Sequence, residues 1–493
     1  MALLFSTFTF SITGFGQSLD RRWLGGYQSG EGAPYGGNKT IFPTAEVAWS
    51  VEESRPMWLS NTMATATDET DSVVVYTNGI AVANRTGQIM LNGSGLNPSS
   101  YTTANAQFGL GLPNSHILLP FPGSDSLVTL FHVTIDGPDD TGILASNFLY
   151  LSVIDMSADA GVGEVVLKNQ VLHSGEFCPS GLAAVKHANG RDWWIFFHTN
   201  DDNVFIQFLL TPEGVDGPWF QAIGTLRHGY GPVTAVSRDG SRLLMMDAGA
   251  DLDVFDLDRC TGLLSNPVHA AIDDSMTLGQ AEFSGSGRFV YVTSVTRMYQ
   301  YDLQASDIQS SQVIVAEWDG TYDTYPGFNT YFTNISNAPD GKIYVSTGNS
   351  TRYMHIIDRP DSLGVACNVI QHGHNRQTFT DNSIPYRPNY YLGPLAGSPC
   401  DTLGLGISEH PPPLNVSAYP NPSAGAFIVS YPAVSEAGVL EVRDLSGKLV
   451  RRERLPAWST IHALSLAEEA TGLYHCTVRW GIHSGTVRIM IDR

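Results

Sequence analysis

The feature that most constrains this fold is a unit of about fifty residues that recurs along the chain. Each copy has a glycine-containing turn, a short apolar strand, a few polar residues and a second apolar strand. Four clear copies carry their turn glycines at Gly190, Gly240, Gly287 and Gly341, at spacings of 50, 47 and 54 residues. A hairpin with two apolar strands cannot cover its own faces, so such units must stack against one another.

This period, with several strands per repeat, favours the blades of a β-propeller over the turns of a solenoid. Weaker copies begin at Thr70 and Pro122. Residues 17–408 have room for seven or eight blades of about fifty residues, and we predict seven. Continuous apolar runs such as Leu243–Met246 indicate strands that neighbouring blades cover on both faces.

The composition changes at a proline-rich linker, residues 409–414, whose prolines Pro411–Pro413 form a stiff, extended spacer. The segment after it, residues 415–493, contains short strands separated by Gly, Pro and Ser turns. Within it Tyr474, Cys476 and Val478 alternate with polar residues, which predicts strands with one core face and one wet face. We therefore predict an all-β protein in which a small β-sandwich follows the propeller.

The C-terminal segment resembles the type A C-terminal sorting domain of the Bacteroidetes type IX secretion system. The residues that carry the resemblance are Tyr419, Pro420, Asn421, Pro422, Gly425, Asp444, Gly447, Lys448, Gly472, Leu473, Tyr474 and the final Arg493. The resemblance implies an immunoglobulin-like sandwich that directs export across the outer membrane. It also implies that the domain is usually cleaved off, and that the cargo is released or anchored to surface lipopolysaccharide.

Residues 40–408 are similar to a group of secreted β-propeller-like proteins of the same bacteria. The similarity is carried by stretches such as AVKHANGRDWWIFFHTNDDNVF and RPNYYLGPLAGSPCDTLG. It implies an architecture and a secretion route, but no activity.

The first sixteen residues are apolar and too short to span a bilayer. They predict a signal peptide cleaved between Gly16 and Gln17, although no basic residue precedes the apolar run, and a buried first strand is the alternative. No other segment predicts a transmembrane span. We expect a secreted or outer-surface protein.

The five cysteines are too few for a disulfide scaffold. For an exported chain the expected pair is Cys367 with Cys400, because both lie near the end of the large domain. Five buried free thiols remain an equal alternative.

The net charge is −21, and it is unevenly distributed. From Pro413 onward there are eight Lys/Arg and seven Asp/Glu, which leaves 19 Lys/Arg against 41 Asp/Glu before it. An acidic body argues against nucleic acid and against membrane surfaces as partners.

Signatures of catalysis are missing: there is no GxSxG, HExxH, P-loop or GxGxxG sequence. Strand alternation would place His372 and His374 on one face, but no third metal ligand is suggested, so we expect a solvated loop. Turn chemistry explains most of the aspartate clusters, with structural calcium as an alternative. These clusters are Asp136/Asp139/Asp140, Asp201/Asp202, Asp251/Asp253 and Asp256/Asp258.

The aromatic runs are expected to pack in the core. They are Trp193-Trp194 (with His187 nearby), Trp219-Phe220 and Tyr390-Tyr391.

Two functions from different classes follow. The first is a non-enzymatic binding or adhesin-like module, with no cofactor, that engages an extracellular glycan or protein. The second is a secreted polysaccharide hydrolase with a carboxylate pair at the propeller axis. A third interpretation makes the propeller a spacer at the cell surface. Two converging carboxylates in a deep axial pocket would favour the hydrolase, and a filled axis would favour binding.

Overall fold

The computed structural model describes residues 21–27, 33–42, 48–52, 55–67, 72–138, 144–228, 231–272, 274–275, 278–324, 327–382, 384–401, 416–445, 447–481 and 483–493. The predicted leader with its Gly16/Gln17 cleavage site and the linker 409–414 lie outside these residues. Within them the helical segments are one α-helix, α1 (Ser100–Ala104), and three short 3-10 helices, η1 (Asp159–Gly161), η2 (Gln309–Ser311) and η3 (Gly364–Cys367). The all-β prediction is confirmed.

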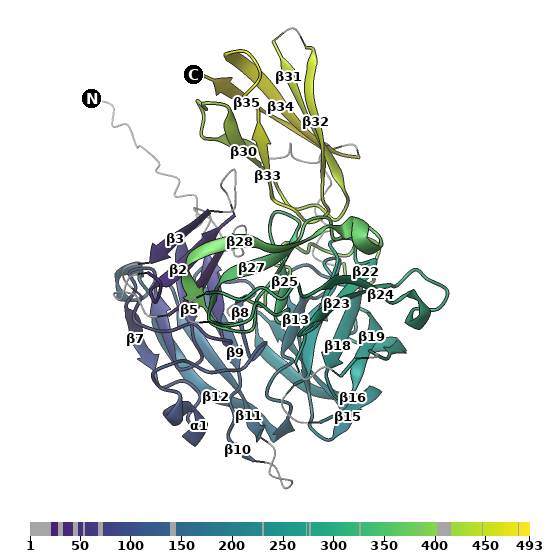
Figure 1. Ribbon diagram of the computed structural model, residues 1–493. Coiled ribbons are helices and arrows are strands. Elements are labelled where there is room, and N and C mark those ends of the chain that lie inside the picture. Colours follow the sequence, from purple (N-terminus) through teal and green to yellow (C-terminus); the bar gives the residue numbers. More distant parts are fainter. Residues whose placement is uncertain are drawn as a thin grey trace, which may run out of the picture.

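The strands before residue 401 form seven antiparallel units in chain order (Figure 1). The units are β1 (Arg22–Gly26), β2 (Gly37–Ile41), β3 (Ala48–Glu52); β4 (Ala64–Thr67), β5 (Val73–Thr77), β6 (Ala81–Asn84), β7 (Ile89–Ser94); β8 (His116–Pro120), β9 (Leu127–His132), β10 (Gly137–Pro138), β11 (Leu144–Asp155), β12 (Glu164–Phe177); β13 (Ala183–Lys186), β14 (Trp193–His198), β15 (Asp202–Thr211), β16 (Gly214–Arg227); β17 (Val233–Val236), β18 (Arg242–Asp247), β19 (Asp251–Leu257), β20 (Leu264–Ala270); β21 (Ala281–Phe283), β22 (Phe289–Ser294), β23 (Arg297–Asp302), β24 (Val313–Glu317); and β25 (Ile335–Asn337), β26 (Ile343–Val345), β27 (Thr351–Ile357), β28 (Val369–Thr380). The second and third units share one sheet, because β7 pairs in parallel with β12 at Leu91 and Glu164. The prediction of a propeller of about seven blades is confirmed.

The first strand of each unit lies nearest the axis, since β13, β17, β21 and β25 contact one another in succession. The continuous apolar runs form the second strands, and every residue of β14 and β22 is buried. The turn that joins the first two strands of the fifth unit places Gly240 at φ +74°, a conformation that favours glycine.

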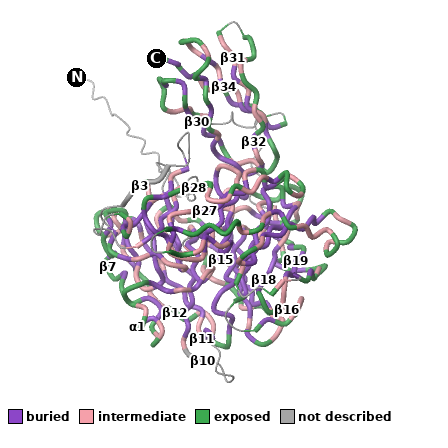
Figure 2. Tube along the Cα trace, in the orientation of Figure 1, coloured by how far each residue is buried: buried purple, intermediate pink, exposed green. Residues whose placement is uncertain are grey.

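Apolar clusters between neighbouring units hold the ring together. The cluster between the fifth and sixth units combines Leu244 and Met246 of β18 with Val290 and Val292 of β22, all buried. Figure 2 shows buried residues concentrated inside the propeller and exposed residues at its rim. Each of these buried clusters thus needs side chains from two neighbouring units, and a single unit could not form it alone.

The ring closes where the seventh unit meets the first. Strand β28 lies against β1, β2 and β3. The Asn38 side chain of β2 donates hydrogen bonds from Nδ2 to Oγ1 of Thr378 and Thr380 in β28, at 2.8 and 2.7 Å. Ends of the chain far apart in sequence therefore become neighbours.

The C-terminal domain is a two-sheet sandwich (Figure 1). One sheet has the order β29-β30-β33 and the other the order β32-β31-β34-β35. The strands are β29 (Ser417–Tyr419), β30 (Ala426–Ser430), β31 (Gly438–Asp444), β32 (Leu449–Leu455), β33 (Ile461–Ser465), β34 (Gly472–Trp480) and β35 (His483–Ile491). Buried Phe427, Val442, Tyr474 and Ile489 belong to the core between the sheets, as the alternating pattern predicts.

Candidate functional site

The axis of the propeller is occupied by a segment of the chain itself. This axial segment, residues 384–395, follows the last blade. Its Tyr390 is buried, with its ring 5.7 Å from that of Trp193 in β14 and its hydroxyl donating to the carbonyl oxygen of Leu118 in β8 at 2.7 Å. Tyr386 packs against three of the clusters between units.

Other contacts of the axial segment reach the first, second and fifth units. Arg387 donates from Nη2 to the carbonyl oxygen of Arg22 in β1 at 2.8 Å, and also to Oγ1 of Thr65 in β4. Asn389 donates from Nδ2 to the carbonyl oxygen of Arg238, just after β17, at 2.5 Å. One segment thus bonds to blades on opposite sides of the ring.

A small cavity remains beside the axial segment. Its volume is about 30 Å³, which suffices for about two water molecules. Its lining combines Trp23, Ala235, Val236, Arg238, Glu282, Ser336, Asn337 and residues 386–389. Pockets for small-molecule ligands usually have volumes of hundreds of Å³, so this cavity is far smaller than a typical ligand site.

Glu282 is the single carboxyl group that lines the cavity. Burial raises the pKa of this carboxyl to about 7, against hydrogen bonds that favour its charged form. Its oxygens accept from the backbone N–H groups of Phe283 at 2.9 Å and Asn337 at 3.4 Å. Glycoside cleavage requires two carboxyl groups flanking a substrate bond, and this cavity supplies one.

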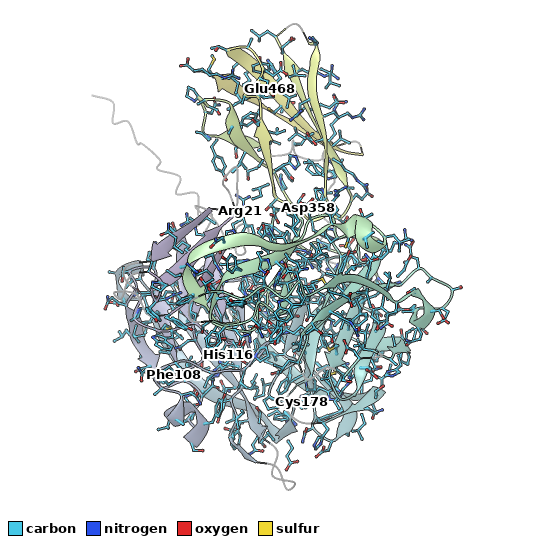
Figure 3. The ribbon with its side chains drawn as sticks, viewed as in Figure 1. Arg21, Phe108, His116, Cys178, Asp358 and Glu468 are labelled. Carbon is cyan, nitrogen blue, oxygen red and sulfur yellow. A yellow bond between two sulfur atoms is a disulfide. The ribbon has the colours of Figure 1, made fainter. Side chains whose placement is uncertain are left out.

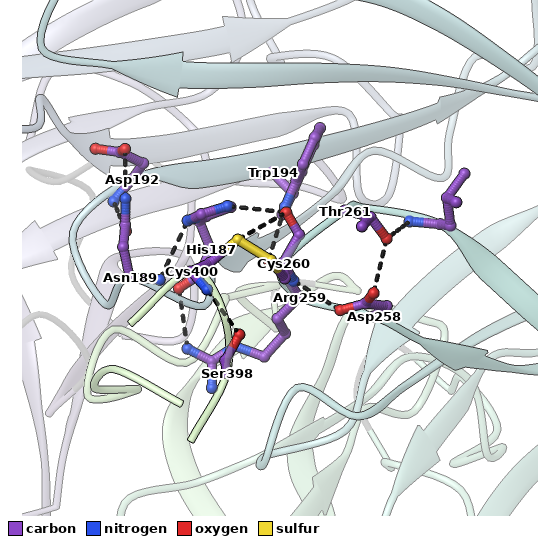
Figure 4. The surroundings of a disulfide bond; sticks show 11 residues. His187, Asn189, Asp192, Trp194, Asp258, Arg259, Cys260, Thr261, Ser398 and Cys400 are labelled. Atoms are coloured by element: carbon purple, nitrogen blue, oxygen red, sulfur yellow. Dashed lines mark hydrogen bonds between the residues drawn. A yellow bond between two sulfur atoms is a disulfide. The ribbon is translucent and has the colours of Figure 1, made fainter. Parts of the chain in front are cut away.

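The chain just beyond the axial segment is fixed by a disulfide bond between Cys260 and Cys400 (Figure 4). The predicted pairing of Cys367 with Cys400 is therefore wrong. Cys367 is a buried free thiol in the cluster between the sixth and seventh units. Cys400 instead follows the axial segment out past the fourth unit, where the amide of Leu395 donates to the carbonyl oxygen of Ala188 at 2.8 Å.

Residues around the bridge include several that the sequence made conspicuous. His187 lies with Nε2 3.0 Å from the carbonyl oxygen of Cys260, and Trp194 donates from Nε1 to that of Arg259 at 2.9 Å (Figure 4). Trp193 and Trp194 are buried, as expected for packing. Trp219 and Phe220 are not core residues, because they lie on the outermost strand β16 and are 44% and 57% exposed.

His372 and His374 lie on opposite faces of β28, which contradicts the expectation from strand alternation. His372 has φ +56°, and a register shift interrupts the pairing of β27 with β28 at this point. Its ring packs against His355 at 5.0 Å, whereas the ring of His374 lies 6.4 Å from that of Tyr344 on the other side. The irregularity turns one side chain over, so the two imidazoles cannot share a metal.

The aspartate clusters serve turns and ion pairs in the described residues. Asp253 accepts from buried Arg227 at 2.8 Å and from His269 at 2.9 Å, and Asp258 accepts from the amide of Cys260 at 2.8 Å. Asp139 and Asp140 lie outside the described residues. Across the described part of the chain, no three His, Cys, Asp or Glu side chains gather closely enough to hold a metal ion.

The first sorting-domain motif ties one edge of the sandwich to its last strand. The Tyr419-Pro420 and Asn421-Pro422 peptide bonds are cis. Asn421 donates from Nδ2 to the carbonyl oxygen of Arg488 at 2.8 Å and accepts at Oδ1 from the amide of Met490 at 3.0 Å. This motif therefore supports β35, the strand that ends the chain.

The later motif residues build turns of the same sandwich. Asp444 accepts at Oδ1 from the amide of Lys448 at 3.1 Å, closing the β31–β32 hairpin, in which Gly447 has φ +83°. Gly425 lies close against the backbone of Ala467. Gly472 begins β34, and the buried Tyr474 donates from its hydroxyl to the carbonyl oxygen of Ala470 at 2.7 Å. A tyrosine bonded back to the chain a few residues upstream resembles the tyrosine corner of immunoglobulin-like sandwiches.

The sandwich packs against the propeller. Ile428 and Ile461 are buried in one cluster with Ala338 and Tyr344 of the seventh unit. The amide of Thr460 donates to the carbonyl oxygen of Pro339 at 3.0 Å.

Further contacts widen this junction. Arg21 lies at the base of the sandwich (Figure 3) and donates from Nη2 to Ser430 Oγ at 2.9 Å. Trp458 belongs to the same cluster as Leu392 of the axial segment. The sandwich thus covers the end of the propeller beside the axial segment.

Sequence reasoning missed both the axial segment and the docked sandwich. The RPNYYLGPL stretch carries the Pro, Asn and Gly residues of a loop, and only its paired tyrosines indicated burial. The docking isoleucines read as ordinary strand residues. The local sequence of neither segment indicates which distant residues it packs against.

Residues 417–492 match the family model described as a secretion system C-terminal sorting domain. No curated protein sequence matches the chain. No helix among the described residues has the length and apolar character needed to cross a membrane.

Solved structures give weak similarities to the propeller. A candidate 6-phosphogluconolactonase from Bacteroides fragilis is 13% identical, with 74% of this chain and 96% of that chain covered and a TM-score of 0.45. The Dos1 propeller is 12% identical, with coverages of 76% and 97% and a TM-score of 0.37. A gluconolactonase from Xanthomonas campestris is 13% identical, with coverages of 67% and 93% and a TM-score of 0.30. Such TM-scores carry no functional argument.

Proposed function

We propose that this chain is an exported binding protein, in which the propeller presents a rigid surface to a glycan or protein outside the cell. The sorting domain at residues 417–492 indicates export by a type IX secretion system, to the cell surface or beyond. The finer assignment to binding rests on one observation, the occupied axis. Residues 384–395 fill the place where a propeller hydrolase would hold its substrate.

The chemistry of the axial cavity supports the same choice. Glu282 has a pKa near neutrality, which suits a general acid. It lines a cavity of about 30 Å³ and has no second carboxyl group beside it there. A single carboxyl, bonded to two backbone amides, does not form the carboxylate pair that glycoside cleavage uses.

Binding and hydrolysis can be separated with the purified chain. We expect the native protein to bind a subset of glycans or proteins on an array, and to release no reducing sugar from a panel of polysaccharides. Glu282→Gln should leave array binding unchanged, because the amide keeps the shape and the carboxyl is buried. Polysaccharide cleavage that is lost in Glu282→Gln would overturn the binding assignment in favour of the hydrolase.

Export is tested in cells. A chain truncated after residue 408 should stay inside a bacterium that possesses the type IX machinery, while the full chain reaches the surface or the medium. The predicted cleavage at Gly16/Gln17 is checked by sequencing the N-terminus of the mature protein. An exported truncated chain would contradict the role assigned to the sorting domain.

A further inference from the structure

The outward face of the four-stranded sheet in the sandwich concentrates positive charge. Directly paired residues on antiparallel strands share a face. Glu441 in β31 lies opposite Arg452 in β32. Arg443 lies opposite His475 in β34, which lies opposite Arg488 in β35. The other face of this sheet carries the core residues.

We call this surface the basic face. Its charged or titratable members are Arg443, Arg452, Arg454, His475, Arg479, Arg488 and Glu441. It therefore holds five of the eight Lys/Arg found from Pro413 onward, but one of the seven Asp/Glu. Glu441 pairs with Arg443 at 3.0 Å and with Arg452 at 3.7 Å, so a single carboxylate balances five guanidinium groups and the face keeps a net positive charge.

An apolar rim borders one end of the basic face. Leu445 in the β31–β32 turn is 70% exposed, Leu449 at the start of β32 is 40% exposed and Met490 in β35 is 39% exposed. Leu449 pairs with Arg443 and Met490 pairs with Leu473, so both point outward beside the arginines. The β31–β32 turn lies at the end of the sandwich farthest from the propeller (Figure 1).

We propose that the basic face and its apolar rim bind the surface of an anionic lipid bilayer. Guanidinium groups match phosphate oxygens in pairs of hydrogen bonds. Exposed leucine and methionine beside them can enter the boundary between head groups and acyl chains. A soluble anion or an acidic protein would use the arginines but gives no reason for the three exposed apolar side chains.

The rest of the chain favours the same orientation. The residues before Pro413 carry 41 Asp/Glu against 19 Lys/Arg, so an anionic surface repels the propeller while it attracts the basic face. The propeller would then face away from the membrane. The negative net charge of the chain argues against binding to a membrane surface, but that charge lies before Pro413 and not on the basic face.

Vesicle flotation with the full purified chain tests the proposal without reference to export. Vesicles of equal parts phosphatidylcholine and phosphatidylglycerol should carry the protein upward at low salt, and vesicles of phosphatidylcholine alone should not. Arg479→Gln with Arg488→Gln should weaken binding about thirtyfold, from the usual attraction per basic residue near an anionic surface. The matched control, Arg359→Gln with Arg451→Gln, removes two exposed arginines away from the face and should bind as the native chain does.

The apolar rim is tested separately. Leu445→Ser with Leu449→Ser should weaken vesicle binding by about tenfold. Leu363→Ser, at a propeller residue that is 59% exposed, should have no effect. Equal flotation of the arginine pair and its control, or salt-sensitive retention on a soluble polyanion without flotation, would overturn the proposal.

Discussion

Replacing Cys260 and Cys400 with serine should lower the stability of the protein while leaving its fold intact. The bridge joins residues separated by 140 positions. In the folded state the axial segment keeps other attachments nearby. Arg259 donates from Nη2 to the carbonyl oxygen of Gly393 at 2.7 Å, and Leu395 remains bonded to Ala188. The main effect should therefore fall on the unfolded chain, which gains freedom when the loop is opened.

The size of the effect follows from the length of the loop. The chain-entropy relation gives about 5 kcal/mol at 25 °C for a closed loop of this length, and losses of about 2–5 kcal/mol are usual for native bridges. Urea unfolding should show a lower midpoint for Cys260→Ser/Cys400→Ser than for the native protein. Circular dichroism at neutral pH should be the same for both.

Reductant provides a matched control. A phosphine reductant should lower the urea midpoint of the native chain toward that of the double variant, and should leave the double variant unchanged. The same reductant has no second bridge to break among the described residues. If the reductant does not change the urea midpoint of the native chain, the disulfide bond between Cys260 and Cys400 is refuted.

Two further predictions concern the docked sandwich and acid. Ile428→Ala with Ile461→Ala removes two buried side chains from the junction, at a cost of about 2–5 kcal/mol each, and calorimetry should show the sandwich melting before the propeller. Ile314→Ala, at a half-exposed position, should leave a single profile, and an unsplit profile for the double variant would contradict the docking. Burial lowers the pKa of His116 to about 3 and that of His132 well below 6.5. Just below pH 6.5, these histidines therefore bind protons in the unfolded chain but not in the folded chain. The two histidines should contribute their full stabilisation above pH 6.5, and the free energy of unfolding should fall as the pH drops toward 3, by about 1.4 kcal/mol per pH unit for each histidine. In His116→Gln the urea midpoint should depend less on pH.

The sequence predicted the propeller because the repeat is a local property. A few adjacent residues are enough to predict each turn, such as Asp239-Gly240, and each apolar strand, such as Leu243–Met246. Stacking then follows from the need to bury what a single hairpin leaves uncovered. The sorting domain was predicted from its resemblance to a known family, carried by motif residues that form turns and cross-strand ties inside one small sandwich.

Pairings across the molecule were not accessible in this way. The sequence placed Cys400 near Cys367 because both lie late in the chain, whereas the fold brings Cys400 to Cys260. Strand alternation placed His372 and His374 together, but one residue with positive φ separated them. Partner choice between distant segments depends on the whole set of blade contacts, which no local pattern encodes.

The amino-acid sequence by itself determined the blade, its repetition and the small C-terminal sandwich, because periodicity and turn chemistry act between residues that are close along the chain. The tertiary structure alone decided that residues 384–395 fill the axis and that the sandwich covers the end of the propeller. It also decided that arginines from four strands share one face. These features arise when strands far apart in sequence are brought side by side, and their energies belong to surfaces that exist only in the folded chain.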